Sequence, residues 1–232
     1  MIDHESNQDS YESAYLIIRD IELFEGRYFI LPEEIFNEFS LKTKDSPEIK
    51  GNAIIAHDLD ESQQTSNEVR DLSELESFHE KIKGCLRCEL GGKRKKFVFG
   101  SGKDNSDIMF IGEAPGEEED RTGKPFVGAA GELLTKIIEA MHLKRDDVYI
   151  CNILKCRPPN NRDPRNSEIA SCEPYLLKQI ELVKPKVICA LGRFAAQTLL
   201  GSNESMGRLR LNSHSFRGIP VVATYHPATL LR

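Results

Sequence analysis

The sequence predicts an α/β sandwich with a parallel sheet, and two observations lead to this fold class. Four short runs are nearly all apolar and rich in β-branched residues, as in strands buried on both faces: 107–115, 148–156, 186–192 and 219–227. The stretches between them have the spacing of amphipathic helices: 130–143, 167–183 and 193–200. Alternating strands and helices are typical of parallel α/β proteins.

Residues 1–70 are expected to form an acidic N-terminal extension with a linker, and residues 71–232 the main domain. Residues 1–80 contain 20 of the 37 acidic side chains but 6 of the 31 Lys and Arg residues. The rest of the chain is therefore basic, although the net charge of the whole is −6. A basic domain is compatible equally with binding to a polyanion and with an ordinary solvated surface. Residues 15–36 are apolar enough to pack against a partner surface.

A helix is expected over 72–82, because apolar residues recur there at helical spacing. Ser73 is a suitable N-cap and Gly84 a suitable stop. No apolar run approaches the ~18 residues of a transmembrane helix. The N-terminus, MIDHESNQDSYES, is polar and acidic, unlike a secretory signal or a transit peptide. These features predict a cytoplasmic location.

Three of the predicted strands end in unusual polar residues. GEAPG follows the first strand, Asn152 and the turn KCRPP lie at the end of the second, and Tyr225-His226-Pro227 ends the last. In parallel α/β sheets, ligands bind beyond the carboxyl ends of the strands. The polar strand ends therefore predict a pocket at one edge of the sheet.

The segment GEAPGEEEDRTGKPFVGAAG occupies residues 112–131. It has neither the GK[ST] of a phosphate-binding P-loop nor the GxGxxG of a dinucleotide-binding loop, and its four consecutive acids would repel phosphate. A hard-cation site on the acids is one interpretation, but a solvated acidic turn is favoured for most of residues 117–120. Phe126 could stack on a flat ring or pack in the core, and the residues alone favour neither.

Four of the six cysteines form two pairs. Cys85 and Cys88 make a CxxC, and Cys156 and Cys172 flank a loop rich in Pro, Asn and Arg. Two such pairs suit zinc or an iron–sulfur cluster, and from the pattern alone zinc is the commoner occupant. The other two cysteines lie inside predicted strands, where small buried hydrophobic residues are expected.

Basic side chains accompany both cysteine pairs. The segment GGKRKKF follows the CxxC, and further arginines lie in the loop between Cys156 and Cys172. A metal that holds both segments together would build one surface facing a phosphate backbone. The candidate phosphate contacts are Lys93, Arg94, Lys95, Lys96, Arg157, Arg162 and Arg165.

Residues from about 75 to 232 closely resemble the family 4 uracil-DNA glycosylases, the iron–sulfur type of bacteria and archaea. Four motifs match in order: the CxxC, GEAPGEEEDRTGKPFVGAAGELL, NILKCRPPNNRDP followed by Cys172, and YHPATLLR. Each motif is modest alone, but the set is highly specific. Family 5 enzymes usually lack Glu at the position of Glu113. A related DNA-crosslinking type has a basic insertion after the first motif, which this chain lacks.

The resemblance implies a three-layer α/β/α sandwich around a central, parallel, four-stranded sheet. It also implies that Cys85, Cys88, Cys156 and Cys172 bind a 4Fe-4S cluster, which reverses the preference for zinc. The implied reaction is hydrolysis of the N-glycosidic bond of deoxyuridine in DNA after the nucleotide has been flipped out of the stack. The product is an abasic site, as in base excision repair.

The resemblance implies roles for the residues at the strand ends. Asn152 would read uracil, Phe126 would stack on it, and His226 would donate a hydrogen bond to uracil O2. Glu113 is the carboxylate expected to face the sugar or water, and Glu119 matches another position regarded as functional in the family. Four further residues are implied: Gly112 and Ala114 as close neighbours of the base, Leu230 as a minor-groove wedge, and Arg232 as a phosphate contact.

A non-catalytic uracil-DNA-binding module, or an iron–sulfur DNA-binding module, is the alternative function. Glu113, Asn152 and His226 are all present, which favours the enzyme. The chain stops at Arg232, where family members usually continue into another helix, so we expect the domain to lack that helix. The expected protein is a nucleoid-associated monomer that binds uracil-containing DNA. A repair or replication protein is a candidate partner for the N-terminal extension.

Overall fold

The computed structural model describes residues 72–231. The predictions for the N-terminal extension, including the apolar stretch 15–36, therefore lie outside the described residues, as does the predicted phosphate contact of Arg232. No helix among the described residues is long and apolar enough to cross a membrane.

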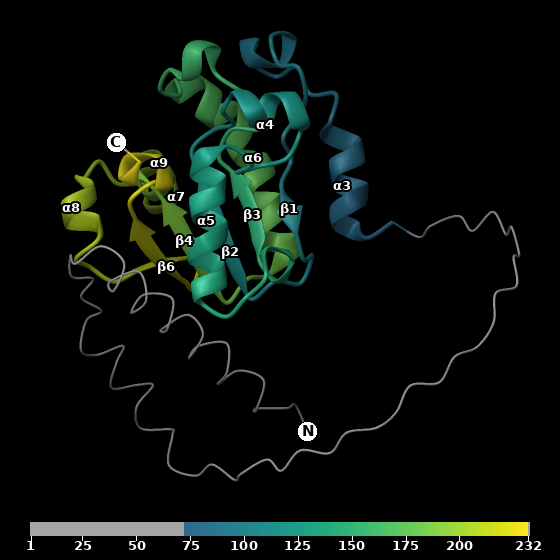
Figure 1. Ribbon diagram of the computed structural model, residues 1–232. Coiled ribbons are helices and arrows are strands. Elements are labelled where there is room, and N and C mark those ends of the chain that lie inside the picture. Colours follow the sequence, from purple (N-terminus) through teal and green to yellow (C-terminus); the bar gives the residue numbers. More distant parts are fainter. Residues whose placement is uncertain (1–71, 232) are drawn as a thin grey trace, which may run out of the picture.

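A six-stranded sheet in the order β1-β3-β2-β4-β6-β5 forms the centre of the fold (Figure 1). The four inner strands are parallel to one another, as predicted: β3 (Tyr149–Asn152), β2 (Ile108–Gly112), β4 (Val187–Leu191) and β6 (Ile219–Thr224). The structure also has two antiparallel edge strands that the sequence did not predict: β1 (Ser101–Gly102) and β5 (His214–Phe216). These edge strands are too short for a periodic pattern to reveal them.

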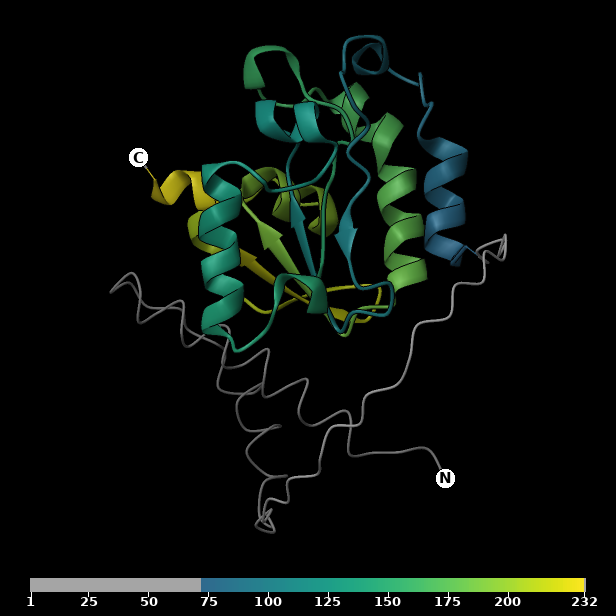
Figure 2. The same ribbon diagram turned by 45° about the vertical axis from the view of Figure 1, so that its right-hand side comes forward.

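Helices cover both faces of the sheet, which makes the sandwich three-layered. Figure 2 shows α5 (Ala129–Ala140) on one side and α6 (Asn166–Val183) on the other, with α3 (Glu74–Ile82) outside α6. The remaining helical segments are η1 (Glu89–Gly92), α4 (Glu117–Thr122), η2 (Arg145–Asp147), η3 (Pro159–Asn161), α7 (Arg193–Leu200), α8 (Met206–Leu209) and α9 (Pro227–Leu230).

Along each inner strand, successive side chains alternate between two separate hydrophobic clusters, one on each face of the sheet. Met109 and Ile111 pack in the cluster that contains α6 and α7, whereas Ile108 and Phe110 pack in the cluster that contains α5. All five residues of β2 are buried. Burial on both faces explains why these strands are almost continuously apolar.

The capping prediction for α3 is confirmed. The backbone N–H of Ser73 donates to the Glu76 carboxylate at 3.0 Å, and the N–H of Glu76 donates to the Ser73 hydroxyl at 3.2 Å. This reciprocal pair satisfies two backbone donors that a helix N-terminus otherwise leaves without partners. The helix ends at Ile82, close to the predicted stop at Gly84.

The acidic block after β2 is a helix rather than the predicted solvated turn. Residues 117–122 form α4, and Gly123 ends it in the left-handed conformation at φ 82°. Asp120 is buried, and its carboxylate accepts a hydrogen bond from the backbone N–H of Lys95 at 2.9 Å. This hydrogen bond attaches α4 to the segment around Lys95, so the acidic block does not lie wholly on the surface.

Candidate active site

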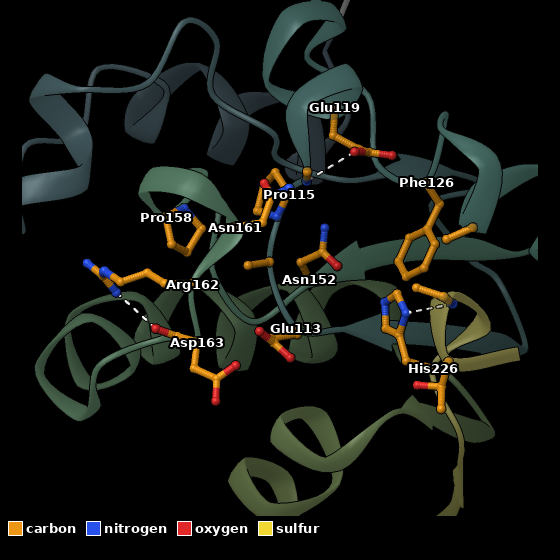
Figure 3. A pocket seen from close by; sticks show the side chains of 15 residues that line it. Glu113, Pro115, Glu119, Phe126, Asn152, Pro158, Asn161, Arg162, Asp163 and His226 are labelled. Atoms are coloured by element: carbon orange, nitrogen blue, oxygen red, sulfur yellow. Dashed lines mark hydrogen bonds between the residues drawn. The ribbon is translucent and has the colours of Figure 1, made fainter. Parts of the chain in front are cut away.

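A pocket of about 380 Å³ lies at the carboxyl ends of β2, β3 and β6, where the sequence predicts it. Figure 3 shows the side chains that line it. Glu113 follows β2, Asn152 ends β3, and His226 follows β6. Ala114, Glu119 and Phe126 also line the pocket. Residues from three separate strand ends and the loop at 112–131 thus meet around one cavity.

Gly112 allows the pocket to be built this tightly. A Cβ atom at position 112 would lie 2.4 Å from Oδ1 of Asn152 and 2.5 Å from Cζ of Phe126. Neither approach is compatible with ordinary van der Waals contact, so any larger residue would displace one of the two side chains. Gly112 thus makes room for Asn152 and Phe126, whereas its predicted close approach to the base stays a prediction.

The Asn152 side chain is buried, and its carbonyl oxygen Oδ1 has no hydrogen-bond partner among the described residues. A buried polar atom without a partner costs on the order of 1–3 kcal/mol, so such atoms are rare unless a ligand satisfies them. Lys155, itself fully buried, donates to the backbone carbonyl of Asn152 at 2.6 Å. This contact fixes the end of β3 while the amide points toward the pocket (Figure 3).

His226 is oriented by its own helix. Its Nδ1 accepts a hydrogen bond from the backbone N–H of Ala228 at 3.1 Å, so the side chain caps the N-terminus of α9. Because Nδ1 is an acceptor, the neutral ring has its proton on Nε2. Burial lowers the pKa of His226, although the charge of Glu119 acts in the opposite direction. The pocket therefore has a neutral imidazole whose Nε2–H is a donor.

Phe126 is both a pocket wall and a core residue. It is 5% exposed, belongs to the cluster around α5, and lines the cavity. Its ring lies beside that of His226, with centroids 5.5 Å apart and planes inclined by 26° (Figure 3). Its φ of 51° lies in the left-handed region, which is uncommon for a residue with a side chain. The two interpretations that the sequence left open for Phe126, a ring that stacks on a flat ligand and a ring that packs in the core, are therefore compatible.

Glu113 is a half-buried carboxyl group in the pocket wall. Burial, followed by the nearby negative charge of Asp163, raises its pKa to about 7, and Arg193 acts in the opposite direction. Asp163 and Arg193 form an ion pair at 3.3 Å. Figure 3 shows the carboxyl groups of Glu113 and Asp163 close together. A carboxyl group with a pKa near neutrality can exchange a proton at physiological pH.

Glu119 organises the loop around Phe126. One of its oxygens accepts from the backbone N–H of Val127 at 2.9 Å and of Gly128 at 3.0 Å, and the other accepts from that of Gly116 at 3.0 Å. The carboxylate thus joins the beginning of α4 to the segment after Phe126. Glu119 was predicted as a catalytic carboxylate; these contacts give it a positioning role.

Several pocket residues were not among the sequence-predicted site residues. Asn161 and Asp163 line the cavity from the loop between Cys156 and Cys172, and Thr229 lines it from α9. They come from the matched motifs NNRDP and YHPATLLR, so the motifs contained the signal. All three are exposed, and their position beside the cavity depends on how the loops fold back over the strand ends.

The four paired cysteines converge on one side of the pocket loops. The electrostatic neighbours of Cys156 include Cys172 and Cys88, and those of Cys172 include Cys88 and Cys85. Burial raises the pKa of Cys156 to about 12 and also raises that of Cys172, while Arg94 and Lys155, respectively, act against this. Nevertheless, no three His, Cys, Asp or Glu side chains within residues 72–231 could hold a metal ion as they are placed.

Hydrogen-bond donors are directed at three of these sulfurs. The Tyr175 hydroxyl donates to Cys85 Sγ at 3.2 Å, Arg94 Nη1 donates to Cys156 Sγ at 3.6 Å, and the Lys155 N–H donates to Cys172 Sγ at 3.4 Å. Donors around thiolates are the usual second shell of a metal–sulfur centre. The chemistry of this set of donors therefore fits an iron–sulfur cluster.

Comparison with known proteins agrees with the pocket geometry. The family model described as Uracil DNA glycosylase superfamily matches residues 99–232. The chain is 42% identical to the Type-4 uracil-DNA glycosylase of Archaeoglobus fulgidus, over 69% of this chain and 84% of that protein. It is 46% identical to the Thermotoga maritima protein of the same description, over 68% and 83%. The chain belongs to the type 4 branch of the uracil-DNA glycosylase superfamily.

The distinction from the type 5 branch is also clear. The chain is 30% identical to the Type-5 uracil-DNA glycosylase of Pyrobaculum aerophilum, over 67% of this chain and 76% of that protein. It is 43% identical to the Type-4 uracil-DNA glycosylase of the same organism. The type 4 assignment that the motifs predict is therefore confirmed.

In this type 4 chain, the predicted phosphate contacts have different environments. Arg94 is the clearest departure: its guanidinium donates to the backbone carbonyls of Cys85 at 2.6 Å, Gly91 at 3.1 Å and Lys83 at 2.9 Å. These contacts hold the CxxC segment, so they replace the phosphate contact predicted for Arg94. Lys93 and Lys95 are exposed, although the Lys93 ammonium lies 3.6 Å from the Glu89 carboxylate.

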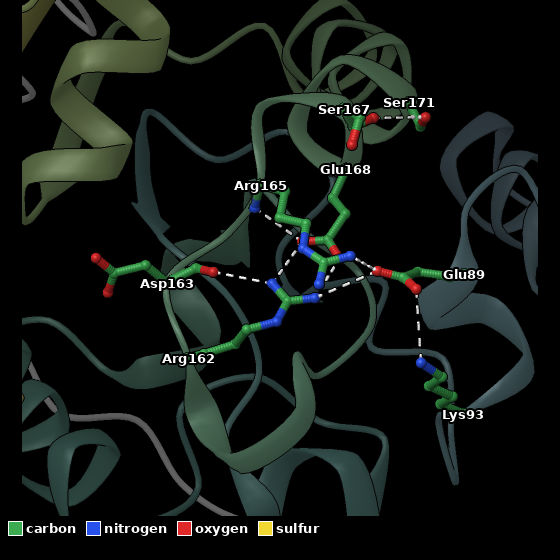
Figure 4. Close-up of polar contacts among 8 residues, drawn as sticks. All are labelled: Glu89, Lys93, Arg162, Asp163, Arg165, Ser167, Glu168 and Ser171. Atoms are coloured by element: carbon green, nitrogen blue, oxygen red, sulfur yellow. Dashed lines mark hydrogen bonds and ion pairs between the residues drawn. The ribbon is translucent and has the colours of Figure 1, made fainter.

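Two arginines of the loop between Cys156 and Cys172, Arg162 and Arg165, are likewise held by carboxylates (Figure 4). Arg162 pairs with the buried carboxylate of Glu168 at 2.6 and 2.9 Å, and both Arg162 and Arg165 contact Glu89. Arg157 donates to Asn161 at 2.8 Å. The network joins the loop that follows Cys88 to the loop that lines the pocket. Leu230 of α9 is exposed, and its role as a minor-groove wedge stays a prediction.

Proposed function

We propose that this protein is a uracil-DNA glycosylase, which removes uracil from DNA and leaves an abasic site. The observation that supports this best is the buried, unpartnered Oδ1 of Asn152 in a pocket that also contains an aromatic ring, a neutral histidine and a carboxyl group. The names of the relatives, Type-4 uracil-DNA glycosylase, point to the same activity.

Recognition of the base would use the two ends of the Asn152 amide. Its carbonyl oxygen accepts from uracil N3–H, and its NH₂ group donates to uracil O4. Cytosine presents a donor and an acceptor in the reverse arrangement, so both ends of the amide would be left without partners. Phe126 supplies the apolar face on which the flipped base stacks.

Cleavage would place negative charge on the leaving uracil and positive charge on the sugar. The C1′–N1 bond breaks and its electron pair stays on the base, while Nε2–H of His226 donates to uracil O2 as the charge develops. Water forms the new C1′–O bond. Glu113, as a carboxylate, opposes the charge of the sugar and accepts the proton that water loses.

The four cysteines would hold a 4Fe-4S cluster, with zinc as the less favoured occupant. The preference for the cluster rests on the likeness to the Type-4 uracil-DNA glycosylases and on the hydrogen-bond donors directed at Cys85, Cys156 and Cys172. The contribution of the cluster would be to fasten the CxxC segment to the loop between Cys156 and Cys172, which lines the pocket.

The direct test is incubation of the purified protein with an oligonucleotide that contains one uracil, followed by alkali. Strand cleavage at the uracil is the expected result, because alkali breaks an abasic site. The matched control replaces uracil by thymine and should stay intact. Tight binding to the uracil strand without cleavage would overturn the proposal and favour the non-catalytic DNA-binding module.

A further inference from the structure

Phe126 has a backbone conformation that its neighbours must maintain. Its φ of 51° is unfavourable for a residue with a Cβ atom, so an isolated loop would relax from it. Gly131 adds a second constraint, because a Cβ atom there would lie 1.9 Å from the carbonyl oxygen of Phe126. The aromatic wall of the pocket thus depends on contacts that fix the peptide groups on both sides of Phe126.

Arg145 fixes the peptide group that precedes Phe126. Its Nη2 donates to the carbonyl oxygen of Pro125 at 2.6 Å, and its Nη1 donates to the hydroxyl of Thr135 at 3.0 Å. The Thr135 hydroxyl in turn donates to the carbonyl of Gly131 at 3.0 Å. One guanidinium thus ties the residue before Phe126 to α5, the helix that packs behind this loop.

Glu119 fixes the peptide groups that follow Phe126, as described above. The two side chains are complementary in charge: burial lowers the pKa of Arg145, but the carboxylates of Asp146 and Glu119 oppose this and favour the cation. Arg145 is half-buried in η2 and is not among the residues that line the pocket. It can therefore act on the base only through the loop that it holds.

We propose that Arg145 is a positioning residue that holds Phe126 in its stacking orientation and so determines how tightly the flipped base is bound. The inference rests on the proposed function, because it requires that a base stacks on Phe126. Lysine could not replace arginine here, since a single ammonium group cannot reproduce the two separate donors that a planar guanidinium directs at Pro125 and Thr135.

The test compares Arg145→Met and Arg145→Lys with Arg121→Met, a change of an exposed arginine on α4 that, among residues 72–231, pairs only with Glu118 at the surface. For each variant we would measure excision, inhibition by free uracil, and affinity for DNA that contains an abasic-site analogue. Stacking of one base contributes on the order of 5- to 100-fold in binding. Both Arg145 variants should therefore need about 5- to 10-fold more uracil for half-inhibition, with abasic-DNA affinity unchanged.

A double-mutant cycle decides whether Arg145 acts through Phe126. Phe126→Ala should weaken uracil inhibition more than Arg145→Met does, and the double variant should be no worse than Phe126→Ala alone. Additive losses, unchanged uracil inhibition, or an equal loss of abasic-DNA affinity would each overturn the inference. If Arg145→Met does not fold, Arg145→Lys takes its place in the same double-mutant cycle with Phe126→Ala. Absence of excision by the unchanged protein would instead refute the proposed function.

Discussion

At the residue scale, the pocket depends on polar side-chain atoms that remain available to a bound base or water molecule. Oδ1 of Asn152 is buried and unpartnered, and Nδ1 of His226 is occupied by the backbone so that Nε2 is the donor. Glu113 has a pKa raised to about 7. The unpartnered Oδ1 of Asn152 and the desolvated carboxyl group of Glu113 are costly for folding and useful only when a base and a water molecule are bound. Their combination at one strand edge is the physical basis of the proposed reaction.

Asn152→Asp should reduce uracil excision by on the order of 100-fold or more, because a carboxylate cannot donate to uracil O4. Some activity toward cytosine is expected instead, because a protonated aspartic acid presents a different arrangement of hydrogen-bond donor and acceptor. Single-turnover assays on uracil and cytosine oligonucleotides measure both effects. A variant with full uracil activity would show that Asn152 does not read the base.

The dependence of excision on pH should follow the ionisation of Glu113. Because the carboxylate is the active form and its pKa is about 7, the rate should rise between roughly pH 6 and 8 and then level off. Burial lowers the pKa of His226, which favours its neutral form over this range. Single-turnover rates across this range would test the prediction.

Glu113→Gln is the matching variant for the pH profile. It should remove the rise with pH, because the remaining activity no longer depends on this ionisation. A glutamine variant that keeps the same rise would assign it to another group. Asp163→Asn is the informative companion: without the nearby negative charge that helps to raise the pKa of Glu113, the midpoint of the rise should move to lower pH.

At the element scale, loops rather than helices and strands bring the site together. The loop after β2 is held by Glu119, and the CxxC loop is held by Arg94. The loop between Cys156 and Cys172 is held by the pair of Arg162 with Glu168, a carboxylate that is 1% exposed. A partly buried pair of this kind resists rearrangement more than an exposed one does. The inner strands provide the rigid edge from which these loops extend.

If the proposed 4Fe-4S cluster is bound, Arg94→Met should lower the iron content of the purified protein and its absorbance at ~400 nm. The change removes the donors to three backbone carbonyls of the CxxC segment and to the sulfur of Cys156. Lost hydrogen bonds of this kind cost on the order of 1–3 kcal/mol each where they leave a buried group unpaired. Iron analysis and thermal unfolding measure the two consequences.

Lys93→Met is the matched control for Arg94→Met, because it removes a neighbouring cation that contacts only the exposed carboxylate of Glu89 in this loop. It should leave iron content and unfolding temperature unchanged. Full iron loading and normal stability in Arg94→Met would contradict the structural role and return Arg94 to the candidate phosphate contacts.

At the scale of the whole molecule, one domain accounts for both cores, the pocket and the cysteine site. The two hydrophobic clusters draw their members from residues 75–223, and the pocket from residues 113–229. We propose that residues 71–232 form the catalytic domain behind an acidic extension of residues 1–70, the division that the charge and the motifs of the sequence predict. We also propose that the protein is a monomer.

Deletion of residues 1–70 should leave uracil excision within about threefold of the full chain, since the structural elements of the site lie beyond the deletion. Binding to DNA at low salt should become tighter, because the deleted segment is strongly acidic. Excision and DNA affinity at two salt concentrations test this. Loss of folding or of bound iron in the shortened chain would show that the extension is part of the domain.

The sequence by itself determined the four inner strands, the helices α3, α5, α6 and α7, the cysteine pairs and the motifs of the pocket. Periodicity and strand-end residues reveal these features because each depends on residues close together in the chain. Only the tertiary structure decided that Arg94 holds the CxxC segment, that Asp120 is buried, and that Glu119 and Arg145 hold Phe126 from opposite sides. These contacts join residues up to 62 positions apart. A pattern of residue types cannot specify them, because they depend on how packed elements place their loops.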